Sequence, residues 1–347
     1  MKNKFIVLII FSACIILLSF ANNASDHSIS KKDIELKIPK GFPKPIYDFK
    51  NNKISPEGFI LGRKLFYDPI LSKDSSTSCQ SCHQRVAAFA HIDHTLSHGI
   101  DGKIGTRNVP AIQNMIWKDT YMADGGVNNM EVQPINPLTN PIEMNESLAH
   151  IILKLKQKKE YVALFKKAYK DTIINSERLL KSLAQFTGLM ISANSRYDKY
   201  LSGKDTFSIQ EKSGLQLFRA KCSGCHQEPL FTDNSYRNNG LMADSSLNDI
   251  GRGRITKIEG DNFKFKVPSL RNIEMTFPYM HDGRYRKLKD VLNHYSSTIS
   301  HNKTTDEDVT KIGSLSDKER KDIIAFLLTL TDKEFLNDKR FVDPNRK

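Results

Sequence analysis

Residues 79–83 (CQSCH) and residues 222–226 (CSGCH) are the two stretches that decide the fold. They lie 143 residues apart and contain every cysteine of the chain except Cys14. The pattern Cys-x-x-Cys-His is typical of covalent c-type haem attachment, in which two thiols bond the porphyrin and the adjacent imidazole reaches the iron. The sequence therefore predicts two covalently bound c-type haems.

Each motif supplies two attachment cysteines and one iron ligand. These residues are Cys79, Cys82 and His83 for the first haem and Cys222, Cys225 and His226 for the second. A pair of structural zinc sites is the alternative interpretation. It requires two further Cys or His ligands for each metal at short spacing, and no such partners follow either motif with regularity.

The N-terminus carries the features of an export signal. Lys2 and Lys4 precede an apolar run over residues 5–20, and residues 19–21 (SFA) fit the small-x-small rule for cleavage. We therefore expect a signal peptide over residues 1–21 and a periplasmic mature protein. Two less favoured alternatives remain, which are a lipoprotein modified at Cys14 and an uncleaved anchor, although a membrane span normally needs ~20 residues.

Composition limits the partners and the sources of stability. The 347 residues carry a formal charge of +13. With four cysteines committed to haem, no disulfide stabilises the mature chain, so the haems and the hydrophobic core must do so. Basic residues are not interleaved with aromatic ones, which argues against a nucleic-acid site and leaves the positive surface free to attract an acidic redox partner.

An internal repeat predicts the architecture. Residues 109–125 match residues 267–283 at a constant offset of 158, and each block follows a haem motif. Two related domains are the simplest explanation. We expect an N-terminal arm over residues 22–55, an N-terminal cytochrome-c-like domain over residues 56–200 and a C-terminal one over residues 201–347.

Between the motifs, apolar residues recur at helical spacing. Residues 148–168 show a 3- and 4-residue period, and Ser208 and Ser316 each begin a capping box with a glutamate three residues later. Strand patterns are sparse, and residues 255–267 are the best candidate for a hairpin. The predicted fold class is mainly α, with long loops and little β structure.

Several further motifs are similar to those of a known family. Residues 99–110 (GIDGKIGTRNVP), 140–144 (NPIEM), 229–233 (PLFTD) and 278–284 (PYMHDGR) resemble the bacterial di-haem cytochrome c peroxidases and the MauG enzymes. This resemblance covers nearly the whole mature chain. It implies an oxidoreductase that reduces hydrogen peroxide to water with electrons from a small mono-haem cytochrome c or a copper protein. A homodimer is also compatible with it.

The resemblance implies that the two haems differ in their sixth ligand. The family's ligand for the second haem stands fourteen residues after His281, which is the position of Tyr295. The position 158 residues earlier holds Pro137, which cannot ligate iron, so the first haem would bind peroxide. A tyrosine here resembles MauG, most peroxidases have methionine, and Met280 is the alternative ligand.

The acid-base group and its neighbour are also implied by the family pattern. Glu143 matches the glutamate that moves a proton between the peroxide oxygens, and Gln133 matches the glutamine ten residues before it. His98 matches a loop histidine that occupies the sixth site of the first haem in many of these peroxidases until reduction ejects it. We expect His91 and His94 to be surface residues.

The family also binds calcium between its domains. The matching ligands are the side chain of Asn108 and the backbone carbonyls of Thr276 and Pro278. Oxygen ligands of this kind suit calcium.

One position departs from the family. A tryptophan that relays electrons between the haems usually precedes the Asp-Gly of the first block, where this chain has Ala123. The path would then use Trp117, Tyr121 or a direct route. Two alternatives to the peroxidase follow: a MauG-like oxidase that modifies a partner protein, favoured by Tyr295, and a non-catalytic electron-transfer protein, favoured by Ala123.

Overall fold

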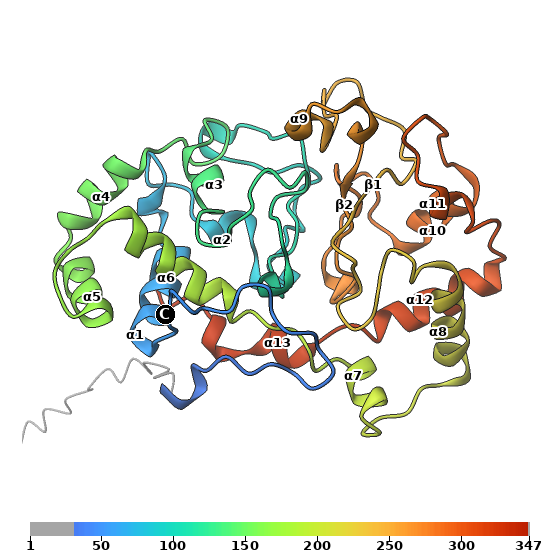
Figure 1. Cartoon of the computed structure of the whole chain (residues 1–347), viewed down its shortest axis with the longest axis horizontal. Helices are drawn as coiled ribbons and strands as arrows, with labels where there is room; N and C mark the ends of the chain where they lie inside the picture. The colour runs from blue at the N-terminus through green and yellow to red at the C-terminus, as the bar shows by residue number, and fades with distance from the viewer. Residues whose placement is uncertain (1–30, 346–347) are drawn as a thin grey trace, which may run out of the picture.

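The computed structural model of the chain describes residues 31–345. Two mainly helical halves lie side by side (Figure 1). The described residues contain only two short strands, which confirms the prediction of a mainly α fold. The expected signal peptide over residues 1–21 lies outside the described residues.

The helices fall into two successive sets with long loops between them. The first half contains α1 (Pro56–Tyr67), α2 (Cys79–Cys82), α3 (Ile135–Thr139), α4 (Leu148–Lys156), α5 (Lys159–Tyr169) and α6 (Ser176–Gly188). The second half contains α7 (Arg196–Leu201), α8 (Ile209–Lys221), α9 (Gly253–Thr256), α10 (Leu288–Ser297), α11 (Glu307–Thr310), α12 (Asp317–Leu328) and α13 (Lys333–Asn337).

The predicted capping boxes begin helices α8 and α12. Ser208 accepts a hydrogen bond from the amide of Glu211, and Ser316 accepts one from the amide of Glu319, while each glutamate bonds back to the serine amide. These bonds satisfy amides that have no partner inside the first turn. The helical period over residues 148–168 likewise forms α4 and α5.

A close helix crossing occurs at the same place in each half. Helix α1 crosses α6 at Gly62, and α8 crosses α12 at Gly214. A Cβ atom at either glycine would lie 1.9 Å from a backbone oxygen, of Ser182 in one half and of Asp322 in the other. Only glycine allows helices to approach this closely, and the shared contact supports the duplication inferred from the sequence.

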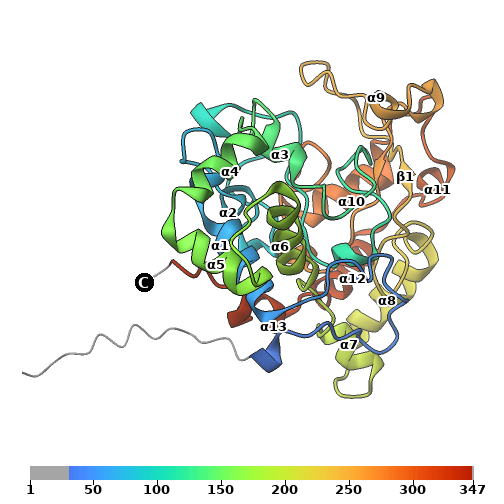
Figure 2. The same cartoon turned by 60° about the vertical axis from the view of Figure 1, so that its left-hand side comes forward.

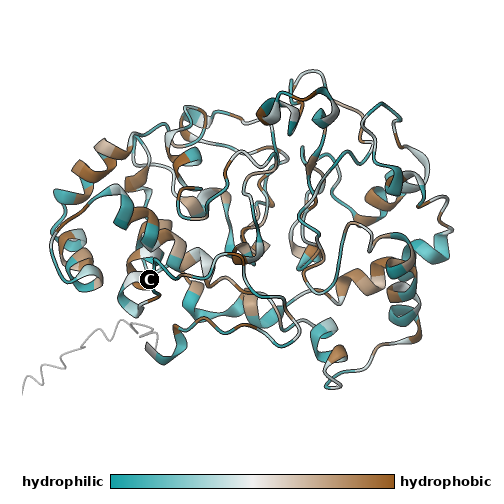
Figure 3. Ribbon diagram, in the orientation of Figure 1, coloured by the Kyte–Doolittle hydropathy of each residue, from teal (hydrophilic) through white to brown (hydrophobic). Residues whose placement is uncertain are grey.

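Each half has its own hydrophobic core. One core joins α1, α5 and α6, and the other joins α8, α10 and α12. Helices such as α12 carry brown and teal residues together (Figure 3), because Ile323, Phe326 and Leu327 are buried while neighbouring residues are polar. In both views, α4 and α5 lie far from α7 and α8 (Figures 1 and 2).

The C-terminal segment returns to the first half. Phe335 of α13 and Phe341 pack into the first core. Phe89, which follows the first haem motif, lies 5.9 Å from Phe335 between ring centroids. The expected boundary at residue 200 stays a prediction.

The small sheet differs from the predicted hairpin. Strand β1 (Tyr236–Arg237) pairs antiparallel with β2 (Phe265–Lys266), and residues 253–256 form α9. The prediction of a hairpin over residues 255–267 was therefore wrong, because the partner of β2 comes from the loop that follows the second haem motif.

Within residues 31–345, no helix combines the length and the apolar character that crossing a membrane requires.

Candidate haem sites

The first motif forms one short helical turn. Helix α2 begins after Ser78, whose amide donates a 3.1 Å hydrogen bond to the hydroxyl of Ser81. The amide of His83 donates to the carbonyl of Cys79 at 2.8 Å. This turn holds both thiols and the imidazole on one local scaffold, as thioether attachment next to an axial ligand requires.

The imidazole of His83 is oriented for iron ligation. Its Nδ1 lies 2.8 Å from the carbonyl oxygen of Phe89, which leaves Nε2 free. Burial lowers the pKa of His83 to about 4, so the ring is neutral near pH 7. A neutral ring whose second nitrogen bonds a backbone carbonyl is the usual form of a ligating histidine.

The second motif repeats this arrangement at the end of α8. The amide of His226 donates to the carbonyl of Cys222 at 3.0 Å. Its Nδ1 lies 3.2 Å from the oxygen of Phe231 and 3.1 Å from that of Pro268. Burial again lowers the pKa of the imidazole. Both motifs therefore fit a c-type haem in the same way.

None of the four motif cysteines is paired in a disulfide. Burial raises the pKa of Cys79 and Cys222 to about 12 and that of Cys82 and Cys225 to about 11. Residues 31–345 contain no group of three or more His, Cys, Asp or Glu side chains arranged to hold a metal ion. The zinc alternative needs such further ligands, so this geometry gives it no support.

Glu143 faces the first motif. Its Oε1 accepts a 2.8 Å hydrogen bond from Nδ2 of Asn140, and its backbone oxygen accepts one from Ile100. Burial raises the pKa of Glu143, and the charge of Glu143 in turn contributes, after burial, to the raised pKa of Cys82. This half-buried carboxyl therefore lies beside a cysteine of the first motif.

Gln133 contacts Met122 rather than Glu143. Its Nε2 lies 3.7 Å from the sulfur of Met122, and no hydrogen bond joins it to Glu143 among the described residues. Pro137, in α3, accepts a hydrogen bond at its carbonyl from Met144. The loop of residues 99–105 packs over this region so closely that a Cβ atom at Gly99 would lie 1.9 Å from the oxygen of Ile142.

The two candidate sixth ligands of the second haem lie against one amide. Nδ2 of Asn239 is 3.4 Å from the hydroxyl of Tyr295 and 3.4 Å from the sulfur of Met280. Burial raises the pKa of Tyr295, and the thiols of the second motif add to this shift. Tyr295 therefore lies near the cysteines of the second motif, and Met280 contacts the same amide of Asn239.

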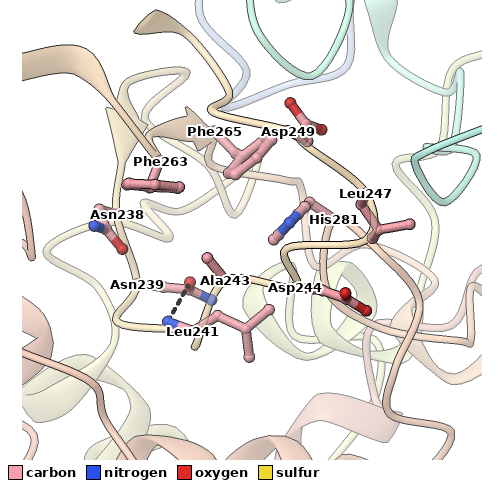
Figure 4. A pocket seen from close by; sticks show the side chains of 10 residues that line it. All are labelled: Asn238, Asn239, Leu241, Ala243, Asp244, Leu247, Asp249, Phe263, Phe265 and His281. Atoms are coloured by element: carbon pink, nitrogen blue, oxygen red, sulfur yellow. Dashed lines mark hydrogen bonds between the residues drawn. The ribbon is translucent and has the colours of Figure 1, made fainter. Parts of the chain in front are cut away.

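The sequence analysis missed Asn239, which has no counterpart in the repeat. A pocket opens beside it, as Figure 4 shows, with His281 and Phe265 on its opposite wall. The rings of these two residues stack with their centroids 3.9 Å apart. The side-chain oxygen of Asn239 also accepts a hydrogen bond from the amide of Leu241, which fixes the orientation of the Asn239 side chain.

The three loop histidines form a row beside the first motif. Ring centroids are 4.1 Å apart for His94 and His98 and 5.4 Å apart for His91 and His94. The backbone oxygen of His98 accepts a hydrogen bond from the thiol of Cys82. His91 is only 4% exposed, so the expectation that it is a surface residue was wrong, whereas His94 is exposed as expected.

The three calcium ligands expected from the family lie across the boundary between the halves. The amide of Asn108 donates to the carbonyl of His281 at 2.7 Å, and its Nδ2 donates to the carbonyl of Thr95 at 2.9 Å. The side-chain oxygen of Asn108 and the carbonyls of Thr276 and Pro278 accept no hydrogen bond from the part of the chain that the structure describes.

Trp117 and Tyr121, the two aromatic residues near Ala123, both donate hydrogen bonds to backbone carbonyls. Trp117 donates from Nε1 to the carbonyl of Pro43 at 2.8 Å, and its ring lies 5.2 Å from that of Phe42. Tyr121 donates to the carbonyl of Lys118 at 3.2 Å. Trp117 thus fixes the N-terminal arm to the first half.

Lys118 is a further residue that the sequence analysis missed. Burial, and then the charge of Lys266, lowers its pKa to about 8. Its charge also contributes to the lowered pKa of His83, so the ammonium lies near the first iron ligand. Nothing in the local sequence distinguishes Lys118 from the many surface lysines of this chain.

Comparisons with known proteins agree with this geometry. Residues 56–206 match the family model of the di-haem cytochrome c peroxidases, and residues 211–331 match that of cytochrome c. The chain is 32% identical to the methylamine utilization protein MauG of Methylorubrum extorquens over 89% of this chain and 86% of that protein. It is 31% identical to the cytochrome c551 peroxidase of Nitrosomonas europaea over 78% of this chain and 79% of that protein.

Solved structures show the same fold. A MauG-like protein associated with microbial copper homeostasis superposes with a TM-score of 0.82 and 32% identity, over 90% of this chain and 99% of that one. The di-haem peroxidase BthA from Burkholderia thailandensis superposes with a TM-score of 0.70 and 21% identity, over 85% of this chain and 91% of that one, which shows the fold alone.

Proposed function

The chain belongs to the family of di-haem cytochrome c peroxidases and MauG proteins, and we propose that it reduces hydrogen peroxide to water at its first haem. Two electrons and two protons convert each peroxide into two water molecules. The electrons enter at the second haem from a small mono-haem cytochrome c or a copper protein. The haem iron supplies the site at which the oxygen–oxygen bond is broken.

The observation that carries this proposal is that the two haem sites differ at one pair of equivalent positions. Both motifs hold their histidine and thiols alike, but Pro137 stands in the first half where Tyr295 stands in the second. A proline ring cannot ligate iron, and a tyrosine hydroxyl or the nearby Met280 sulfur can. One site is therefore suited to bind a small oxidant, and the other is suited to electron transfer.

We assign the proton movement to Glu143. Because Asn140 holds Oε1, Oε2 is the atom that accepts a proton from the inner oxygen of peroxide and returns it to the outer one. The raised pKa of the half-buried carboxyl favours both steps of this proton exchange, since the group can hold a proton and release it. Gln133 is assigned as a donor that orients the peroxide, and His98 as the ligand displaced on reduction.

We also propose a calcium ion at the boundary between the halves. The side chain of Asn108 and the carbonyls of Thr276 and Pro278 would hold it, and their free oxygens support this assignment. The family and the haem motifs support a periplasmic location, since c-type haem attachment follows export. The expected signal peptide over residues 1–21 would provide it.

A MauG-like oxidation of a partner protein is the second candidate. Similarity to a protein named MauG over nine-tenths of this chain supports it, as does Tyr295. In that case peroxide would still be consumed at the first haem. The electrons would come from a side chain of the partner protein instead of a reduced cytochrome.

Steady-state turnover separates these functions. The haem-loaded protein is mixed with hydrogen peroxide and a reduced mono-haem cytochrome c, and cytochrome oxidation is followed by absorbance. The peroxidase predicts many cytochromes oxidised per enzyme. Peroxide consumption without cytochrome oxidation, together with a mass change in a co-purifying protein, would favour the second candidate, and no peroxide consumption at all would leave only electron transfer.

A further inference from the structure

Two hydrogen bonds between the halves of the molecule indicate that an approximate two-fold axis relates one half to the other. The amide of Asn108 donates to the carbonyl of His281 at 2.7 Å, and the amide of Lys266 donates to the carbonyl of Ala123 at 2.8 Å. Lys266 follows Asn108 by 158 residues, and His281 follows Ala123 by the same offset. The second bond is thus the counterpart of the first with the halves exchanged.

Residues that contact their own counterparts locate the axis. Gln113 donates from its side chain to the carbonyl of Arg271 at 2.6 Å. The guanidinium of Arg107 lies over the ring of Phe265, 5.5 Å from its centroid. The two members of each pair are 158 residues apart in the sequence, so the axis passes between the members of each pair. Any feature beside Asn108 should therefore have a counterpart beside Lys266.

The Lys266 side chain ends among oxygen atoms. Its Nζ lies 2.8 Å from the hydroxyl of Thr120, 3.0 Å from the carbonyl of Asn234 and 3.1 Å from a carboxylate oxygen of Asp119. The side chain is only 8% exposed. Residues 119 and 120 come from the opposite half, so a buried positive charge joins the two halves here.

The counterpart place lacks such a charge. Residues 277 and 278 are the counterparts of Asp119 and Thr120, and Asn108 stands where Lys266 stands. Asn108 is neutral and shorter than lysine, and it bonds a carbonyl of its own half, at Thr95, as Lys266 does at Asn234. The carbonyls of Thr276 and Pro278 accept no hydrogen bond from the described residues, whereas the oxygens around Lys266 accept hydrogen bonds from its ammonium.

We infer that the ammonium of Lys266 is a built-in cation that occupies the counterpart of the calcium site. The inference rests on the proposed calcium site for the comparison between the two places. Carboxylate, hydroxyl and carbonyl oxygens are the ligands that a hard cation prefers. The chain therefore binds one dissociable calcium ion at the boundary between the halves, beside Asn108. The equivalent position beside Lys266 binds no calcium at any calcium concentration, because the covalently attached ammonium already occupies it.

An ordinary buried ion pair is the competing explanation. It accounts for the bond to Asp119, but it gives no reason for a second cation to enter when lysine is shortened. The built-in cation predicts that removing the ammonium exposes three oxygens that calcium can use. The two explanations therefore differ in the number of ions bound.

The test counts calcium ions per haem-loaded full chain, by equilibrium dialysis followed by elemental analysis. Lys266→Ala is compared with wild type and with Lys264→Ala, a matched lysine in the same segment that pairs with Asp261. We expect one ion in wild type and in Lys264→Ala, and two ions in Lys266→Ala. Asn108→Ala should bind none, and the double variant of Asn108 and Lys266 should bind one.

Failure of the inference is distinguishable from failure of the calcium site. If wild type binds one ion and Lys266→Ala also binds one, the inference is overturned and the calcium site stands. If wild type binds none, the calcium site is wrong, and the inference then holds only if Lys266→Ala gains an ion. Should this variant not fold, Lys266→Asn is prepared with calcium, and folding that requires calcium supports the inference whereas failure under both conditions overturns it.

Discussion

Nδ2 of Asn140 donates a 2.8 Å hydrogen bond to Oε1 of Glu143, so only Oε2 of this half-buried carboxyl is free to exchange a proton. The carboxyl lies beside Cys82 of the first motif, whereas the position 158 residues later in the chain holds His301. This difference is the basis for assigning peroxide chemistry to the first haem.

Glu143→Gln should slow peroxide cleavage by ~10²-fold or more, because the amide keeps the shape of the side chain but cannot move the proton. Stopped-flow absorbance of the haem-loaded variant measures the rate. Glu160→Gln, at an exposed residue of α5, is the control and should be unchanged. An unchanged rate in Glu143→Gln would remove this residue from the mechanism.

The rate of peroxide cleavage should fall at low pH because Glu143 becomes protonated; this fall is the acid limb of the pH profile. The carboxylate form accepts the proton, and burial raises the pKa of this group above its ordinary value of 4.5. The rate should therefore be full above that raised pKa and should fall as the pH drops through it. The Glu143→Gln variant should lack this limb, and a limb that persists in the variant would belong to another group.

Tyr295→Phe should open the second haem if the phenolate is its sixth ligand. An anionic oxygen ligand stabilises ferric iron, so the variant should have a higher reduction potential and an altered electron paramagnetic resonance spectrum. Met280→Leu is the matched variant, because its sulfur lies at the same distance from Asn239 as the hydroxyl. If only Met280→Leu changes the second haem, the ligand is methionine and the chain resembles ordinary peroxidases more closely than MauG.

Gly214→Ala should destabilise the second half by about 1–3 kcal/mol or more, because the new Cβ atom would lie 1.9 Å from the backbone oxygen of Asp322. Denaturant unfolding of the haem-loaded protein measures the loss. Gly260→Ala is the control, since its Cβ atom would meet nothing closer than 4.0 Å. Equal stability of both variants would show that the helices can separate at no cost.

Local patterns predicted the features that depend on neighbouring residues. The haem motifs, the two capping boxes and the repeat all rest on fixed short spacings, and the family match of Glu143 placed it beside the first motif. The repeat also predicted long-range order, because duplicated segments fold alike. The glycine crossings of α1 with α6 and of α8 with α12 show this.

Contacts between distant segments could not be predicted in this way. Asn239 meets Tyr295 only because a loop of the second half packs against α10, and Phe341 returns to the first core from the far end of the chain. His91 is buried by the path of its loop and not by its neighbours in sequence. The partner of β2 was missed for the same reason.

The most direct test of the account is the number of cyanide ions bound by the haem-loaded protein. We propose that the two equally attached haems differ on their distal sides, one beside Pro137 and Glu143 and the other beside Tyr295. Cyanide is titrated against the oxidised and the half-reduced protein, and binding is followed by absorbance and electron paramagnetic resonance. We predict one cyanide for each pair of haems, bound at the first haem and, if His98 blocks that site, only after half-reduction. Two cyanides bound, or none in either state, would contradict the division between the two haems.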